Sequence, residues 1–260
     1  MTAARRRAGR WRGGPALLLV VVGVGLWEGA IRLFRVPDYL LPAPSAIVAD
    51  FGADGRLLLD NALVTLTEMA LGLALAVAAG LLLAVALHLS GTLRRAVYPL
   101  LIGSQTVTVV VLAPILVILL GFDLAPKLAI VALVCFFPIV VNTVDGLRSV
   151  DPELVRMMRT LDGSRWAILK RVELPWALPL AFSGMRVAAT YAAIGAVFGE
   201  WAGSSAGLGY LMLQATPNLD TPRIFAAIVI LTVLSLALFL LIRALERLLV
   251  PWARPAAARP

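Results

Sequence analysis

Long apolar runs separated by short polar segments dominate the sequence. Six of these runs approach the roughly 20 residues that a helix needs to cross a bilayer. They cover approximately residues 16–34, 63–89, 100–120, 128–144, 180–198 and 224–242. A soluble chain of 260 residues could hide one such helix in its core, but not six. The pattern therefore predicts an all-α integral membrane protein with six transmembrane helices.

The two ends of the chain extend this prediction to a single membrane domain. We expect a basic N-terminal tail at residues 1–15, one transmembrane domain at 16–250 and a short C-terminal tail at 251–260. The first apolar run could instead belong to a secretory signal peptide, because five arginines precede it. Its length and the lack of a small-residue cleavage site favour a retained span. Within it, Glu28 and Arg32 can pair because they lie four residues apart on a helix.

The content of polar side chains gives little support to catalytic chemistry. Only 15% of the residues are charged, against about a quarter in an ordinary globular domain. The single cysteine, Cys135, excludes an intrachain disulfide, and the single histidine, His88, disfavours a histidine metal site. We expect both to be packing or interface positions. No Walker A, nucleophile-elbow, zinc or dinucleotide motif occurs, so we expect neither enzymatic activity nor a bound cofactor or metal.

The net charge of +8 is distributed as in a membrane protein rather than a nucleic-acid-binding protein. Six spans place both termini on one side of the membrane. If that side is the cytoplasm, the internal segments hold seventeen basic residues and the external segments five, with Arg186 inside the fifth run. The positive-inside rule then places both termini, and a long polar stretch at 147–179, on the cytoplasmic side of a cell inner or plasma membrane. We expect no nucleic-acid partner.

The polar stretch at 147–179 has the pattern of two short helices joined by a turn. Asp151 can cap a first helix that has Pro152 at its first position. The Asp-Gly-Ser sequence at 162–164 breaks this helix, and its serine can cap a second one. Pro175 and Pro179 are expected to end the second helix before the fifth span. The loop thus predicts two short helices that stand off the membrane.

Three roles fit this loop by its residues alone. It could be a membrane-surface segment, with Trp166 among the headgroups and basic side chains on lipid phosphates. It could be a docking element whose helix enters the groove of a partner. It could also be regulatory, although no specific residue supports that role.

The loop also resembles the cytoplasmic signature loop of ABC importer permeases, known as the EAA loop. The family pattern is Glu-Ala-Ala, three residues, Gly, about nine residues, an aliphatic residue, any residue and Leu-Pro. The matching positions here are Arg156-Met157-Met158, Asp162 and Val172-Glu173-Leu174-Pro175. The spacing and the Leu-Pro agree with the family, whereas the glutamate, the alanines and the glycine are replaced. Gly163, one position later, can still supply the turn.

This resemblance implies that the chain works with several partners. Permeases of this family form a dimer with a second permease copy, and they work with ABC ATPase subunits and an extracytoplasmic solute-binding protein. The partner ATPases use ATP and Mg, and a coupling helix in the loop seats in a cleft of the ATPase. We place that helix at about 164–171. The expected coupling residues are Glu153, Arg156, Arg159, Asp162, Gly163, Ser164, Arg165, Trp166, Leu169, Lys170 and Pro175.

Other segments narrow the resemblance to one group of importers. YLLPAPSAI at 39–47, FFPIVVNTVDGLRSVDPEL at 136–154 and GLGYLM at 207–212 resemble permeases for nitrate, sulfonates, taurine and thiamine precursors. SQTVTVVVLAPILVILLGFDLAPK at 104–127 and YAAIGAVFGEWAG at 191–203 resemble, in particular, permeases for the pyrimidine precursor of thiamine. The resemblance therefore implies inward transport of a thiamine-precursor pyrimidine, with a sulfonate, taurine or nitrate as alternatives.

Polar residues inside apolar spans are costly, so they are candidates for the solute pathway. Gln105 could hydrogen-bond an aromatic amine, Tyr191 could stack on it, and Glu200 could accept from an exocyclic amine. Alternatively, hydroxyls often bond only their own helix, Glu200 could lie in water, and Glu68 is expected near a helix end. The expected pathway residues are Ser104, Gln105, Thr108, Asn142, Thr190, Tyr191 and Glu200. With Arg186 as the only basic residue near them, the set favours a neutral or cationic solute.

Proteins of two other classes remain alternatives for a chain with several spans. An ion-gradient-driven secondary carrier or channel usually has internal repeats or broken helices, and no repeat between the two halves is evident. A membrane-embedded enzyme would need paired catalytic groups, which the spans lack. The small residues Gly72 and Gly80 are expected to permit close helix packing rather than to carry chemistry.

Overall fold

Helices make up the regular structure of the part of the chain that can be described. The structure is a computed structural model that describes residues 14–161 and 164–253. No strand occurs in these residues, which confirms the predicted all-α fold class. Expectations about the N-terminal head at 1–13, about Asp162 and Gly163, and about the C-terminal residues 254–260 lie outside the described residues.

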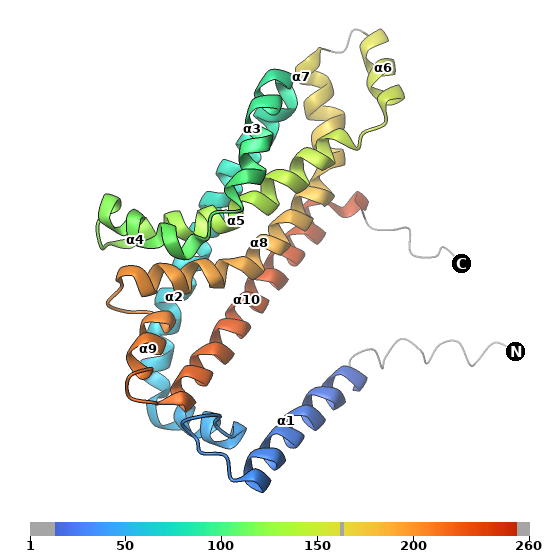
Figure 1. Cartoon of the computed structure of the whole chain (residues 1–260). Helices are drawn as coiled ribbons and strands as arrows, with labels where there is room; N and C mark the ends of the chain where they lie inside the picture. The colour runs from blue at the N-terminus through green and yellow to red at the C-terminus, as the bar shows by residue number, and fades with distance from the viewer. Residues whose placement is uncertain (1–13, 162–163, 254–260) are drawn as a thin grey trace, which may run out of the picture. The chain divides into compact units, whose positions relative to one another are not determined.

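The helices follow the predicted apolar runs and extend beyond most of them. In chain order they are α1 (Gly14–Phe34), α2 (Pro44–Leu89), α3 (Gly91–Ser104), α4 (Val109–Leu120), α5 (Leu124–Arg148), α6 (Pro152–Thr160), α7 (Arg165–Ile168), the π-helical turn η1 (Leu169–Glu173), α8 (Leu174–Gly203), α9 (Leu208–Ala215), α10 (Thr221–Leu249) and the 3-10 turn η2 (Pro251–Ala253) (Figure 1). Helix formation is cooperative, so a span that has formed continues into its polar flanks until a turn stops it.

Several of these helices are long and apolar enough to cross a membrane. Four meet this description within the described residues, namely α2, α5, the continuous run Arg165–Gly203 and α10. The number rises to five if α3 and α4, which meet at 104°, together form one broken span. The expected six spans are reached only if the broken pair counts as one span and α1 crosses the membrane as well.

The broken pair corrects the prediction of one straight span at about 100–120. The break falls in the polar segment between α3 and α4. The hydroxyls of Ser104 and Thr106 donate to carbonyls three residues earlier, at 2.7 and 2.8 Å. Thr108 then adopts an extended conformation, with ψ of 125°, immediately before α4. Side-chain bonds of this kind offer the backbone an alternative to continuous helix, which explains why apolar character alone gave the wrong geometry.

The chain divides into two compact units, and the first of them brings α1 together with part of α10. This unit contains residues up to Leu59 and the segment Leu211–Val229. Its Glu28 accepts from the amide and the hydroxyl of Ser45, at 3.1 and 2.8 Å. The same carboxylate lies 2.6 Å from the guanidinium of Arg32. The predicted pairing of Glu28 with Arg32 is therefore confirmed.

The second unit, Asp60–Tyr210 with the residues from Ile230 onward, contains the helices that carry the candidate site. Helix α5 packs closely against both α2 and α8. A Cβ at Gly72 of α2 would lie 2.5 Å from Val131 of α5, and one at Gly195 of α8 would lie 2.8 Å from the same residue. A Cβ at Gly80 of α2 would lie 2.9 Å from the side chain of Ile139 of α5. These distances confirm that Gly72 and Gly80 permit close helix packing.

Candidate functional site

Helix α6 forms the first half of the predicted two-helix loop and is largely exposed. Its N-cap is the predicted one, because the carboxylate of Asp151 accepts from the amide of Glu153 at 2.8 Å and Pro152 occupies the first turn. No residue of α6 is buried. The apolar side chain of Met157 is 54% exposed, and the predicted coupling residues Glu153, Arg156 and Arg159 are also exposed. The helix therefore offers both apolar and basic groups to a partner.

The second half of the loop is continuous with the fifth span. Ser164 accepts from the amide of Ala167 at 3.2 Å and so caps α7 as predicted, but the helix then runs from Arg165 to Gly203. The expected stop at Pro175 and Pro179 is wrong. Pro175 lies in the first turn of α8, directly after the π-helical turn η1. We attribute the continuity to this wider turn, which accommodates a ring that cannot donate to the helix ladder.

The predicted coupling residues of this second half divide into an exposed set and an anchoring set. Arg165, Trp166 and Lys170 are exposed, and Trp166 shows 68% of its surface. Leu169 is fully buried and packs in a cluster with residues of α5 and α8, while Pro175 is half-buried. The exposed side chains are thus fixed on a helix whose other face is part of the core.

Two polar contacts tie this part of the loop to the end of α2. The Nε2 of His88 lies 2.9 Å from Oε2 of Glu173, and both side chains are mostly buried. The guanidinium of Arg165 donates to the backbone carbonyl of Leu89. We call these two contacts the loop-end contacts. They were not predicted, because His88 and Glu173 are far apart in the sequence and each was assigned to a separate segment.

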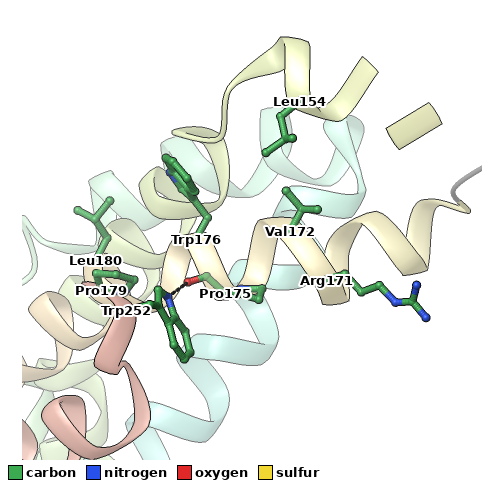
Figure 2. Close-up of a pocket in the computed structure, with 8 residues that line it drawn as sticks. All are labelled: Leu154, Arg171, Val172, Pro175, Trp176, Pro179, Leu180 and Trp252. Carbon is green, nitrogen blue, oxygen red and sulfur yellow. Dashed lines mark hydrogen bonds between the residues drawn. The ribbon is translucent and has the colours of Figure 1, made fainter. Parts of the chain in front are cut away.

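A groove of about 560 Å³ runs beside the start of α8 (Figure 2). The α8 side of its lining lies on one helical face, because the residues are spaced three and four apart. The indole of Trp252 is part of the lining, and its Nε1 donates to the carbonyl of Pro175 at 3.3 Å. The full lining is Leu154, Arg171, Val172, Pro175, Trp176, Pro179, Leu180 and Trp252. The start of α8 therefore presents an apolar face between α6 and the C-terminal turn η2.

Buried polar side chains join α2, α5 and α8 at a second place, far along these helices from the loop. Thr65, Glu68 and Glu200 are each at most 1% exposed. The Nζ of Lys127 lies 2.9 Å from Oε1 of Glu68 and donates to Oγ of Ser204 at 2.7 Å. We call Asn61, Thr65, Glu68, Lys127, Glu200 and Ser204 the buried network. It encloses two carboxyl groups and one amino group where an unpaired charge would be costly.

The buried network holds the segment that leads from α8 into α9. Glu200 accepts from the hydroxyl of Thr65 at 2.6 Å and from the amides of residues 209 and 210 at 2.5 and 3.2 Å. Thr65 accepts from the amide of residue 208 at 2.9 Å, and Asn61 accepts from that of residue 207 at 2.6 Å. The first amides of a helix have no acceptor within that helix. Side chains of α2 and α8 supply the acceptors for α9.

The predicted pathway residues do not converge on one pocket in the described residues. Ser104, Gln105 and Thr108 are exposed around the break between α3 and α4. Asn142 donates to the carbonyl of Pro138 at 2.8 Å and Thr190 to that of Val187 at 2.7 Å, each within its own helix. Tyr191 is 43% exposed on α8. Their contact with a solute stays a prediction.

Glu200 differs from the other pathway candidates because it is enclosed. It does not lie in water, and its known hydrogen bonds go to the chain itself. Glu68, expected near a helix end, lies instead in the middle of α2 and is fully buried. The cost of a polar group inside a span did identify Glu200 as special. The same cost applies to Glu68 and Lys127, but the sequence did not identify the partner of either residue.

The four or five helices that are long and apolar enough to cross a membrane, together with the exposed two-helix loop, are features of a multi-pass membrane protein. The chain belongs to the family of binding-protein-dependent transport system inner membrane components, which matches residues 76–255. It is therefore an ABC transporter permease and a multi-pass inner-membrane protein, as the resemblance implied.

Three relatives show the range of transporters to which the chain is similar. The formylaminopyrimidine transport permease protein ThiX of Halalkalibacterium halodurans is 37% identical over 241 residues, 92% of this chain and 96% of the relative. The riboflavin transport system permease protein RibX of Chloroflexus aurantiacus is 37% identical and covers 91% and 88%. The putative aliphatic sulfonates transport permease protein SsuC of Bacillus subtilis is 32% identical and covers 96% and 92%. All three are named as transport permeases.

Proposed function

We propose that this permease moves a thiamine-precursor pyrimidine into the cell. A separate ATPase binds the loop at 147–179 and drives this transport. The observation that carries the proposal is the continuity of the loop with α8. A partner that moves α7 also moves α8, because Arg165–Gly203 is one helix. A packed helix shifts as a unit, so a displacement of the loop also displaces the fifth span.

The exposed side chains of the loop support a docking role over a lipid-surface role. Trp166, Met157 and Leu161 are each more than half exposed. Arg156 and Arg159 accompany them on α6. Aromatic and arginine side chains are the groups that most often dominate binding at protein interfaces. We place the coupling surface on α6 and α7 together, rather than on 164–171 alone, because α6 is the half with no buried residue.

The orientation and the partners follow from charge and from the family. The excess of basic residues on the loop side supports a cytoplasmic location for this loop and for both termini. There the loop meets an ABC ATPase, which binds ATP with Mg. An extracytoplasmic solute-binding protein delivers the solute from the other side, and a second copy of the permease completes the pathway between two sets of spans. ATP shifts the transporter between outward and inward states through its differential affinity for them.

The charges inside the helices support an uncharged solute. Arg186 of α8 pairs with Glu246 of α10, and Lys127 pairs with Glu68. Neither of these cations is left free to attract a sulfonate or nitrate. The relative named for formylaminopyrimidine transport, at 37% identity, agrees with this choice. A sulfonate remains the second candidate, because the aliphatic sulfonate permease is 32% identical over 96% of the chain.

Reconstitution tests the proposal directly. The permease, its ATPase and its binding protein, placed together in proteoliposomes, are expected to take up a formylaminopyrimidine only when ATP is present. An aliphatic sulfonate, taurine, nitrate and riboflavin serve as competing solutes. Uptake that survives ATP depletion and collapses with the proton gradient would instead identify a secondary carrier, a class in which broken helices such as α3–α4 also occur.

Replacing Trp166 with alanine is expected to lower ATP-dependent uptake about tenfold, as loss of an exposed aromatic anchor at a protein interface does. The amount of permease in the membrane should be unchanged, because most of the surface of Trp166 is exposed. Phe34→Ala is the matched control, since this aromatic side chain is 75% exposed and lies outside the loop. Equal losses of uptake and of membrane insertion in Trp166→Ala would reject the docking role.

A further inference from the structure

We infer that α2 is a second arm of the coupling device, which carries motion from the loop to the segment between α8 and α9. The inference rests on the proposed function, because it assumes that an ATPase moves the loop. It assigns positioning roles to four residues that the family resemblance does not single out. These residues are Thr65 and His88 on α2, Glu173 in η1 and Glu200 on α8.

The first step is the attachment of α2 to the loop. The imidazole of His88 and the carboxylate of Glu173 meet at 2.9 Å, and their side chains are only 16% and 14% exposed. The guanidinium of Arg165 adds a bond to the carbonyl of Leu89, the last residue of α2. A movement of α7 and η1 therefore pulls on α2 as well as on α8.

The second step is the attachment of α2 to the α8–α9 segment. Asn61 and Thr65 accept from the amides of residues 207 and 208, while Thr65 also donates to Glu200 at 2.6 Å. Each of these groups is buried. Separating them would leave polar atoms without partners in the core, at a cost of about 1–3 kcal/mol for each group. The contact is therefore expected to move as one body.

The third step is the stiffness of what lies between the two attachments. Thr65 and His88 lie on one α-helix, so at a rise of 1.5 Å per residue they are roughly 35 Å apart. The only non-helical residue inside α2, Asp54, lies outside this stretch. Between the attachments, Gly72 and Gly80 bring α2 into close contact with α5, which packs on α8 as well. Helices α2 and α8 are thus joined at two places, near Thr65 and near His88 of α2, and α5 packs against both helices in between.

The consequence concerns the exposed turn between α8 and α9. Ser205 lies in this turn and is exposed. The hydroxyl of the preceding Ser204 accepts from Lys127 and donates to the carbonyl of Ala206. If α2 and α8 move together, the surroundings of Ser205 change whenever the ATPase changes state. If only α8 carries the motion, the bonds to α2 make no difference to this change.

A cysteine at position 205 tests the inference. The parent protein is the full complex with Ser205→Cys and with the buried Cys135 replaced by alanine. The measured quantity is the rate of labelling by a membrane-impermeant maleimide, with and without trapped ATP. We expect a change of at least about fivefold in the parent, the lower end of usual allosteric coupling, and less than about twofold after Thr65→Val, Glu200→Gln, His88→Ala or Glu173→Gln.

Matched controls separate coupling from folding. Thr67→Val removes an exposed hydroxyl that bonds its own helix at Leu63, and Asp145→Asn changes an exposed carboxylate on α5; both should keep the full change. Thr65→Ser, which retains the hydroxyl, should restore the response lost in Thr65→Val. If Thr65→Val lowers the amount of permease in the membrane, its labelling rate is compared with that of Thr65→Ser rather than with that of the parent.

The outcomes distinguish the inference from the proposed function. If no ATPase co-purifies with the parent permease, the proposed function fails and the inference falls with it. If the ATPase binds and drives uptake, but the labelling change is absent in the parent or persists in all four variants, only the inference is overturned. A change lost in all four variants and kept in both controls establishes α2 as the second arm.

Discussion

Replacing Gly207 with alanine is expected to abolish transport and to lower the free energy of unfolding by at least about 3 kcal/mol. Two effects act together at this position. Gly207 has a φ of +118°, which side-chain-bearing residues rarely adopt. A Cβ there would also lie between 2.2 and 2.4 Å from the three atoms of the Glu200 carboxyl group. That carboxylate cannot retreat without giving up its bonds to Thr65 and to the start of α9.

Uptake into proteoliposomes and the thermal unfolding midpoint in detergent measure this effect. Gly52→Ala is the control, because a Cβ at Gly52 meets nothing within 4 Å. Alanine there should be neutral or stabilising by up to about 1 kcal/mol, since Gly52 lies inside a helix. A Gly207→Ala protein with the midpoint and uptake of the parent would show that the carboxylate of Glu200 does not hold this turn.

The sequence was sufficient to predict the all-α fold class and the helix caps of the loop, because both depend on local patterns. Apolar character over about twenty residues predicts a span, and the caps at Asp151 and Ser164 depend on residues within three positions. The same local reasoning failed at Pro175, where the helix continues. Its prediction of a stop took no account of the π-helical turn η1, which changes the backbone geometry immediately before the ring.

The buried network could not be predicted from the sequence, because its contacts join residues that are distant along the chain. Thr65 and Glu200 are separated by 135 positions, and Lys127 and Ser204 by 77. The energetic cost of a buried charge indicates that a partner must exist, but it does not identify the partner. For this reason Glu200 was interpreted as a solute ligand and Lys127 as an external loop residue, whereas the structure brings both into one network.

The enclosed charges also constrain how the transporter can use its helices. Lys127 and Glu68 are held on α5 and α2, and Arg186 and Glu246 on α8 and α10. Breaking either pair within the membrane would expose charge to a medium of low dielectric constant. Movements of the spans are therefore expected to keep these helix pairs together, and to occur instead at the broken pair α3–α4 and at surfaces that the described helices leave exposed.

Replacing Lys127 with methionine is expected to lower the free energy of unfolding by about 3–5 kcal/mol, the usual effect of removing one partner of a buried ion pair. The substitution leaves Glu68 fully buried with no cation beside it and removes the bond to Ser204. Uptake should fall to background, because the network no longer holds the turn before α9. Lys170→Met is the control, since Lys170 is exposed on η1. Its unfolding midpoint should match that of the parent.

The double variant Lys127→Met with Glu68→Gln separates the cost of an orphaned charge from the loss of the contact itself. Removing both charges leaves two neutral side chains of similar size, so at least about half of the lost stability should return. Thermal midpoints of the two single variants and the double variant complete the cycle. If the double variant is as unstable as the sum of the single ones, the two residues do not act as a pair. The stability of this region would then have to come from the bonds that Thr65 and Glu200 make to α9.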